Sequence, residues 1–267
     1  MDDSGQILVF DRALVRAHRN RAAASFAQHG ALFDEVAAQL IERLAGIKQK
    51  FQSVLDLGAH GGALARHFAE QGVPFVVAAD ISEKMLAPAR TLRVAADEEF
   101  LPFAPNSFDL IVSNLSLHWV NDLPGALRQI KNALRPGGLF LASLIAGSSL
   151  SELRASLLEA ELKIAQGVSP RLSPAITLQT AAALLQHAGF RLPVADMEKV
   201  TLEYADVFAL MRDLRGMGES NAHCLRARKP IRRQVFQETA RLYRNRFAEG
   251  AGLPATFEIV FMHGVRG

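Results

Sequence analysis

The sequence predicts an α/β protein built on one seven-stranded sheet, with helices on both faces and a helical lid between the last two strands. Three observations lead to this prediction. The chain has 267 residues, of which 49% are hydrophobic and 21% charged, so it can bury a large core. Short apolar runs alternate with amphipathic segments over residues 53–144, which is typical of a parallel sheet covered on both faces. After residue 144 the alternation gives way to longer helical segments and a final apolar strand.

The first half of the chain supplies five of the expected strands. Residues 31–47 place apolar side chains at helical spacing, which predicts a helix ahead of the sheet. The expected strands are 53–57, 75–79, 94–96, 108–113 and 139–144. The helices expected between them are 62–71, 82–90 and 123–134.

The second half supplies the last two strands and the lid. The expected helices are 150–166, 178–187, 206–214 and 231–247, and the expected strands are 194–202 and 256–262. The final strand returns to the sheet from a long connection, so we expect it to lie beside 194–202 and to run antiparallel to the other strands. The predicted organisation is an N-terminal helical cap (1–50), an α/β core (51–203), a helical lid (204–250) and the final strand of the core (251–267).

The cysteine content and the apolar pattern restrict the compartment. The single cysteine, Cys224, cannot form an intramolecular disulfide, which favours a reducing compartment. No Cys/His spacing indicates structural zinc. No apolar run is long enough to span a membrane as a helix, and the N-terminus lacks the features of a secretory signal. We expect a cytoplasmic protein in a bacterium, or a protein on the matrix side in a mitochondrion.

Positive charge gathers in two segments of the chain. One contains Arg12, Arg16, Arg19 and Arg21, and the other covers residues 226–233. Nucleic-acid binding would favour aromatic side chains interleaved with these charges, and neither segment has any. We therefore interpret both as solvated helix faces and expect no nucleic-acid partner. An acidic protein surface is the alternative partner.

The first expected strand ends in a loop that suits a nucleoside ligand. Glycines let a backbone turn sharply and approach a ligand closely, and the helix N-terminus that follows suits an anionic group. The spacing is not the G-x-G-x-x-G of a dinucleotide site, and a plain strand–helix connection is the alternative. The loop reads Asp56-Leu57-Gly58-Ala59-His60-Gly61-Gly62.

Polar side chains follow the next three strands. Asp80 and Ile81 come after the second strand, Asp97 and Glu98 after the third, and Asn114 after the fourth. The carboxyl ends of parallel strands share one crevice, so we expect these residues to line one ligand site. The first carboxylate can accept both hydroxyls of a ribose, and the acidic pair can accept from an adenine amino group. Helix caps and turns are the alternative role for these side chains.

Together with residues 108–111 and 135–138, these segments resemble the class I S-adenosylmethionine-dependent methyltransferases, whose sheet is Rossmann-like. The resemblance implies S-adenosylmethionine as the cofactor, with the glycine loop at its methionine end, Asp80 at the ribose and Asp97 at the adenine. His60 stands where the family usually has its middle glycine, and we expect Gly61 to supply the missing backbone freedom. The expected cofactor-binding residues are Asp56, Gly58, Gly61, Gly62, Asp80, Ile81, Asp97, Glu98 and Asn114.

A closer resemblance extends over nearly the whole chain. Residues 10–14, 96–103, 116–124 and 216–221 resemble the methyltransferase-fold assembly factors of mitochondrial respiratory complex I. That family is regarded as hydroxylating an arginine of an iron–sulfur subunit, so the resemblance implies a protein partner of this kind. The front half of the chain resembles, more distantly, the enzymes of biotin synthesis that methylate malonyl-acyl carrier protein.

Four further residues are candidates for the chemistry at the acceptor. His118 follows the fourth strand, where a histidine can act as a general base or can fix the loop by a hydrogen bond. Trp119 can line the acceptor cleft or serve packing. Glu219 and Asn221 follow two glycines in the lid and can face a guanidinium group, and a role in ending a helix is the alternative. No histidine has the spacing of a facial iron triad, so we expect no metal site.

Three functions stay open on the sequence. Methyl transfer needs only a bound sulfonium and an aligned nucleophile, so the residue chemistry favours a methyltransferase that acts on a protein or a carrier-bound acceptor. The resemblance over the whole chain favours arginine hydroxylation. A non-catalytic assembly chaperone with a structural cofactor site is the third alternative.

Overall fold

The computed structural model describes residues 8–165, 167, 170, 176–227, 231–248, 250 and 252–267. The expectations for the first seven residues, for Gln166 and for residues 228–230 lie outside this part of the chain. Among the described residues, no helix is both long and apolar enough to cross a membrane.

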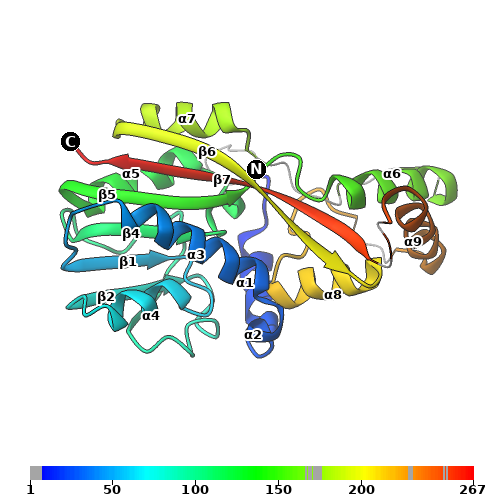
Figure 1. The fold of residues 1–267 in the computed structure, drawn as a ribbon, viewed down its shortest axis with the longest axis horizontal. Helices are drawn as coiled ribbons and strands as arrows, with labels where there is room; N and C mark the ends of the chain where they lie inside the picture. The colour runs from blue at the N-terminus through cyan, green and yellow to red at the C-terminus, as the bar shows by residue number, and fades with distance from the viewer. Residues whose placement is uncertain are drawn as a thin grey trace.

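One seven-stranded sheet forms the centre of the protein, in the order β3-β2-β1-β4-β5-β7-β6 (Figure 1). Neighbouring strands from β3 to β5 pair in parallel, and β7 runs antiparallel to both of its neighbours. The predicted fold class and the direction of the final strand are therefore confirmed. The strands are β1 (Ser53–Leu57), β2 (Phe75–Asp80), β3 (Leu92–Ala95), β4 (Phe108–Asn114), β5 (Leu134–Ile145), β6 (Arg191–Tyr204) and β7 (Leu253–Val265).

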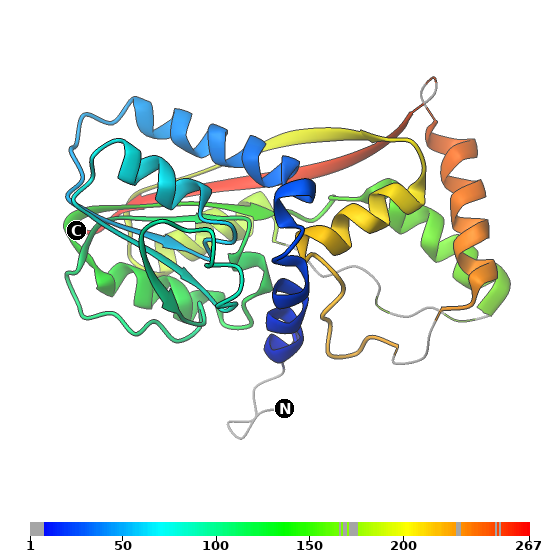
Figure 2. The ribbon, with the colours of Figure 1, turned by 90° about the horizontal axis from the view of Figure 1, so that it is seen from below.

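Helices cover both faces of the sheet, and Figure 2 shows the sheet between the two layers. On one face α3 (Ala31–Ala45) and α4 (Ala63–Glu70) bury their apolar stripes against the strands. On the other face α5 (Leu123–Ala133) and α7 (Leu178–His187) do the same. Both faces of the central strands are therefore dry, which explains why all five residues of β1 are buried.

The two last strands extend beyond the rest of the sheet. β5 pairs with β7 only as far as Ile259, and from Glu258 to Leu253 the strand β7 pairs with β6 alone. This two-stranded ribbon leads to three further helices, which lie beyond the sheet in Figure 1. They are α6 (Ser151–Ala165), α8 (Val207–Met217) and α9 (Arg233–Phe247). The last two belong to the connection between β6 and β7, where the sequence predicts the lid.

Two N-terminal helices, α1 (Arg12–Ala22) and α2 (Phe26–His29), lie beside the carboxyl ends of the central strands (Figures 1 and 2). α1 begins at Asp11, whose side chain accepts a hydrogen bond from the backbone N–H of Leu14 at 3.0 Å. The face that α1 buries includes Arg19, whose side chain is 1% exposed. The prediction that this arginine segment is a solvated face is therefore wrong for Arg19.

The helix predicted over residues 82–90 is also wrong, because this segment forms successive turns. The Asp80 carboxylate accepts from the N–H of Ser82 at 2.7 Å, and the Ser82 hydroxyl accepts from the N–H of Met85 at 3.1 Å. Such side-chain bonds give the backbone an alternative to the helix. Pro88 then lacks a donor and disfavours helical geometry in the residue before it. The next strand, β3, begins two residues earlier than expected, at Leu92.

Candidate active site at the carboxyl edge of the sheet

The loop after β1 turns sharply in order to enter α4. Gly58 and Gly62 adopt left-handed backbone angles, with φ of +68° and +71°. A Cβ atom on Gly58 would lie 2.0 Å from the Ser116 hydroxyl oxygen, so only glycine fits there. His60 also has a positive φ, of 46°, and Gly61 does not. The expectation that Gly61 supplies the freedom of the missing family glycine is therefore wrong, because His60 itself takes the strained conformation.

Aromatic rings hold His60 in this conformation. Its imidazole stacks on Phe26 with 5.6 Å between centroids and meets Phe33 edge-on at 4.6 Å. Its backbone N–H donates to the Asp80 carboxylate at 3.0 Å. Burial and the nearby charge of Arg19 lower the pKa of His60 to about 3, so the ring is neutral at physiological pH.

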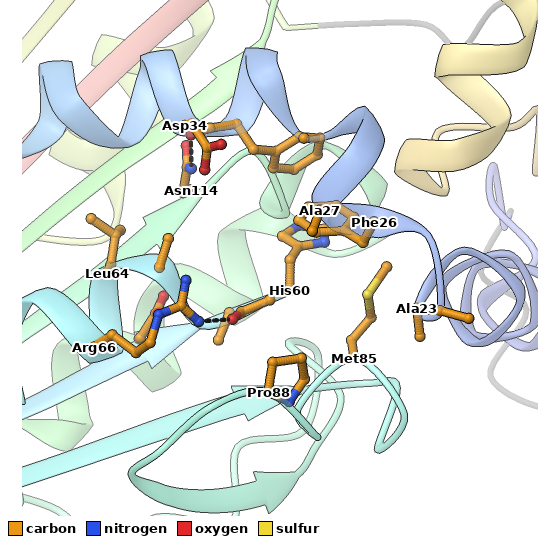
Figure 3. Close-up of a pocket in the computed structure, with 17 residues that line it drawn as sticks. Ala23, Phe26, Ala27, Asp34, His60, Leu64, Arg66, Met85, Pro88 and Asn114 are labelled. Carbon is orange, nitrogen blue, oxygen red and sulfur yellow. Dashed lines mark hydrogen bonds between the residues drawn. The ribbon is translucent and has the colours of Figure 1, made fainter.

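A cavity of about 320 Å³ lies beside the loop, between α2, the start of α3 and the turns after β2. Figure 3 shows the labelled side chains around it, including His60, Asn114 and Met85. Gly61 also lines the cavity. The Asn114 side chain is held in place, since it donates to the Phe33 carbonyl at 2.9 Å and accepts from the Ser143 hydroxyl at 2.9 Å.

Asp56 lines the same cavity and has one free oxygen. Its Oδ2 accepts from the N–H of Ala65 at 2.9 Å, while Oδ1 is buried without a hydrogen-bond partner among the described residues. Burial raises the pKa of Asp56 to about 7. An unpartnered acceptor at a cavity wall is suited to a ligand that brings a donor, above all a cationic one.

Two of the predicted carboxylates share the buried guanidinium of Arg19. Its Nη1 donates to Asp80 Oδ2 and to Glu98 Oε1, each at 3.1 Å, and its Nη2 donates to the Ser116 hydroxyl at 2.8 Å. Both carboxylates are fully buried. Burial raises the pKa of Asp80, whereas at Glu98 the charges of Arg19 and Arg12 outweigh burial and lower the pKa to about 2.

Arg12, the first residue of α1, binds the remaining predicted carboxylate, Asp97. It donates to both oxygens of Asp97, at 2.6 and 3.2 Å, and also pairs with Glu98. Its Nη1 donates to the Trp119 carbonyl at 3.1 Å. The structure thus brings Asp80, Asp97 and Glu98 together as predicted, but with two arginines of α1 bound to them. Ile81 is buried directly after Asp80.

The loop after β4 joins this cluster to the connection between β6 and β7. It contains a short 3-10 helix, η1 (Leu117–Trp119). One oxygen of Glu219, Oε2, lies 3.0 Å from His118 Nε2 and accepts from Trp119 Nε1 at 2.9 Å. Burial would raise the pKa of Glu219, but the His118 interaction lowers it. Glu219 Oε1 and His118 Nδ1 are buried without a partner among the described residues.

Asn221 lies two residues further on, and backbone groups occupy its side chain. It donates to the Pro170 carbonyl at 2.7 Å and accepts from the N–H of His223 at 2.9 Å. The structure therefore places Glu219 with His118 and Trp119, and Asn221 apart from them.

Sequence reasoning missed Arg12, Arg19 and Ser116 as site residues. The signal for the two arginines was their spacing of seven, which places them on one face of a helix. Ser116 gave no signal, because a serine after a strand is common in loops.

Comparison with known proteins identifies the class of protein that this fold and site define. A methyltransferase domain family matches residues 25–193. The chain is 38% identical over 265 residues to "Arginine-hydroxylase NDUFAF5, mitochondrial" of Danio rerio, covering 96% of this chain and 82% of that protein. It is 34% identical over 271 residues to the malonyl-acyl-carrier-protein O-methyltransferase of Methylovorus sp., covering 96% of this chain and 89% of that enzyme.

Solved structures share the fold. Phosphoethanolamine N-methyltransferase 2 of Haemonchus contortus, in complex with S-adenosyl-L-methionine, superposes with a TM-score of 0.55 at 18% identity, covering 92% of this chain and 57% of that one. The protein is thus an α/β protein of the S-adenosylmethionine-dependent type. It belongs to the methyltransferase domain family.

S-adenosylmethionine is the cofactor of this family and fold, and two halves of the site fit it differently. The cavity beside Gly61, which Asp56 also lines, fits the methionine end, because Asp56 has a buried oxygen without a partner among the described residues. The nucleoside end has the expected carboxylates, but Arg19 and Arg12 occupy them in this conformation. The residues of the site therefore fit the cofactor, but α1 lies where its arginines occupy the carboxylates that the nucleoside would need.

Proposed function

We propose that this protein is an enzyme that transfers the methyl group of S-adenosylmethionine to an acceptor held beside His118. The observation that carries the proposal is the buried pair of His118 and Glu219 at the carboxyl end of β4, next to the glycine loop. The loop after β4 touches the glycine loop directly, since His60 Nε2 lies 3.4 Å from the Leu115 carbonyl. An acid–base pair at this position is close to where the family binds its methyl donor.

The chemistry assigned to the pair is proton removal from a protonated acceptor such as a guanidinium side chain, whereas an ionised carboxylate on a carrier protein needs no base. When bound, the cofactor supplies an electrophilic methyl group on a sulfonium. Glu219 fixes the orientation of the imidazole through Nε2, which leaves Nδ1 to accept the proton of the attacking nucleophile. Trp119 donates to the same carboxylate oxygen and so holds Glu219 in place.

The acceptor that we propose is a side chain of a protein, or an acid bound to a carrier protein. Two observations support this class. The relatives quoted above are named for an arginine and for a malonyl group on acyl carrier protein. Glu219 Oε1 is a buried, unpartnered acceptor that suits a donor such as a guanidinium. We place the protein in the cytoplasm of a bacterium, or in the mitochondrial matrix if its source is eukaryotic.

A second candidate function is hydroxylation of an arginine in an iron–sulfur subunit of respiratory complex I. The identity of 38% over 96% of the chain to an arginine hydroxylase favours it, together with the resemblance to complex I assembly factors. Among the described residues, no group of three or more His, Cys, Asp or Glu side chains is arranged to hold a metal ion. A non-catalytic chaperone is the third candidate.

The product mass separates these candidates. The purified protein is incubated in air with S-adenosylmethionine, a reductant and either malonyl-acyl carrier protein or the complex I iron–sulfur subunit, because hydroxylation would need O₂ and two electrons. Both products are followed by mass spectrometry. Methyl transfer adds a CH₂ group to the acceptor and releases S-adenosylhomocysteine. An added oxygen atom without S-adenosylhomocysteine would contradict methyl transfer and support hydroxylation, and no change in either acceptor would support the chaperone.

Two variants test the assigned roles. His118→Gln and Glu219→Gln are expected to lower the rate of modification by about 100-fold, the ordinary contribution of a general base. Both variants are expected to keep the cofactor affinity of the native protein, because the pair is not among the cofactor residues. A Glu219→Gln enzyme of native rate would show that the pair only holds the loop.

A further inference from the structure

The nucleoside end of the cofactor site is closed by the protein itself. We propose that α1 is a gate, and that cofactor binding displaces Arg12 and Arg19 and breaks the hydrogen bonds that tie α1 to the segment 216–224, which carries Glu219. This inference rests on the proposed function, since it assigns a control to the same site. It makes cofactor binding and the opening of the acceptor side one event.

Both oxygens of each carboxylate that Arg19 binds already accept hydrogen bonds inside the protein. Asp80 uses Oδ2 for Arg19 and for the N–H of His60, and Oδ1 for the N–H of Ser82. Glu98 uses one oxygen for Arg19 and the other for Arg12. Asp80 and Glu98 are both 0% exposed. Ribose hydroxyls can therefore reach Asp80 only after the Arg19 guanidinium has left.

The closed state also has an unsatisfied group. Arg19 Nε is buried without a hydrogen-bond partner among the described residues. A buried donor without a partner costs free energy, so the ion-pair cluster holds α1 less firmly than its charges suggest. A ligand that supplies its own donors to the carboxylates can compete with such a cluster.

Hydrogen bonds tie α1 to the connection between β6 and β7 along its whole length. Near its start, the N–H of Asp11 donates to the Ala222 carbonyl at 2.9 Å, and the N–H of Cys224 donates to the Val9 carbonyl at 2.8 Å. Further along, His18 Nδ1 lies 3.2 Å from the Ser220 carbonyl. A movement of α1 away from the carboxylates therefore breaks hydrogen bonds to the residues that follow Glu219.

The same movement reaches the proposed acid–base pair. Glu219 holds both His118 and Trp119, and it lies between Gly218, which packs on Arg19, and Ser220, which binds His18. Gly218 has a φ of +86°, so a side chain there would strain the backbone at the point where α8 ends. Displacing α1 frees Glu219 Oε1 and His118 Nδ1 for an acceptor, so an acceptor can dock only on the loaded protein.

Hydrogen exchange on the native protein tests the gate without any substitution. With saturating S-adenosylhomocysteine as the probe, we expect the amides of Asp11 and Cys224 to exchange at least about tenfold faster, because their bonds between α1 and the connection are broken. The sole cysteine, Cys224, provides a second reporter, and its reaction with a thiol reagent should accelerate in parallel. Bound probe with unchanged or slower exchange at both amides would overturn the gate.

A pair of variants tests the competition directly by calorimetry. Arg19→Met removes the guanidinium that binds Asp80 and Glu98. Arg16→Met removes an exposed arginine of the same helix and is the matched control. We expect the first to bind S-adenosylhomocysteine at least about tenfold more tightly than the native protein, and the second to bind like it. Weaker or equal binding by Arg19→Met would overturn the gate alone. No binding by any of the three proteins would overturn the proposed function and the gate with it.

Discussion

Asp56 and His60 stand four residues apart in the glycine loop, and burial shifts both of their pKa values toward the neutral form. The pKa of Asp56 is raised to about 7, and the pKa of His60 is lowered to about 3. Their locations explain the direction, because a buried site disfavours whichever form carries the charge. These two residues give the site measurable pH dependences.

The Asp56 shift predicts that cofactor affinity rises with pH. Below pH 7 the free protein holds Asp56 protonated, while the cationic ammonium of the cofactor's methionine end favours the carboxylate. Binding therefore releases a proton at low pH, and affinity should rise about tenfold between pH 6 and pH 8. Calorimetry in buffers of different ionisation enthalpy measures both effects. An Asp56→Asn variant should show neither, and a native affinity equal at pH 6 and pH 8 would contradict the assignment.

The His60 shift predicts a loss of stability in acid. The unfolded histidine takes up a proton near pH 6.5, and the folded one resists protonation down to about pH 3. The unfolded state thus binds more protons in this window, and the free energy of unfolding falls as the pH falls. Between pH 7 and pH 5 the loss from this group is about 2 kcal/mol. Denaturant titration of His60→Gly should show a correspondingly smaller loss, and an identical loss would place the acid sensitivity elsewhere.

For single residues, the sequence predicts which acidic side chains lie close together, but it does not predict the arginines that bind them. Asp80, Asp97 and Glu98 converge because the carboxyl ends of parallel strands share an edge. Arg19 escapes prediction because its partners are 61 and 79 residues away, and a helix with four arginines gives no local sign of which one is buried.

Among the elements, the loop between β1 and α4 is the part of the site that tolerates least change. Gly58 needs a left-handed φ and has the Ser116 hydroxyl directly above its Cα hydrogen. Ser116 in turn binds Arg19 and Glu98. The loop therefore sets the distance between the glycine turn and the carboxylate cluster.

A matched pair of glycine substitutions separates backbone strain from this close approach. Gly72 has a φ of +79° and nothing within 4 Å of a built Cβ, so Gly72→Ala should cost only the strain, about 1–2 kcal/mol. Gly58→Ala carries the same strain and also forces Ser116 to move, for a further cost of about 1–3 kcal/mol. Chemical denaturation measures both. Equal losses would mean that the loop can relax away from Ser116.

The elements that periodicity predicts best are those with an uninterrupted pattern. The strands β1, β2 and β4 are correct within one residue, because buried strands of a parallel sheet are apolar throughout. The strand β5 begins five residues before the expected start at 139. The segment 82–90 fails because apolar residues at helical spacing coexist with a serine and a proline that favour turns. Here the local hydrogen bonds of Asp80 and Ser82 outweigh the periodicity.

At the scale of the whole molecule, three parts that are far apart in the sequence meet at one edge of the sheet. They are α1, the strand ends with the glycine loop, and the connection between β6 and β7. The sequence predicts the sheet and the lid separately, because each has its own pattern. The contacts through which α1 joins the sheet to the lid link residues more than 200 positions apart in the sequence, such as His18 and Ser220. No local sequence pattern encodes such contacts.

We expect S-adenosylmethionine to bind at the carboxyl edge of β1, β2 and β3 and to replace Arg19 as the partner of Asp80. A crystal structure of the native protein with S-adenosylhomocysteine tests it most directly. We expect ribose hydroxyls bonded to Asp80, the methionine end beside Asp56, and the Arg19 guanidinium moved out of the site. A ligand bound elsewhere, or bound with Arg19 still on Asp80 and Glu98, would contradict it.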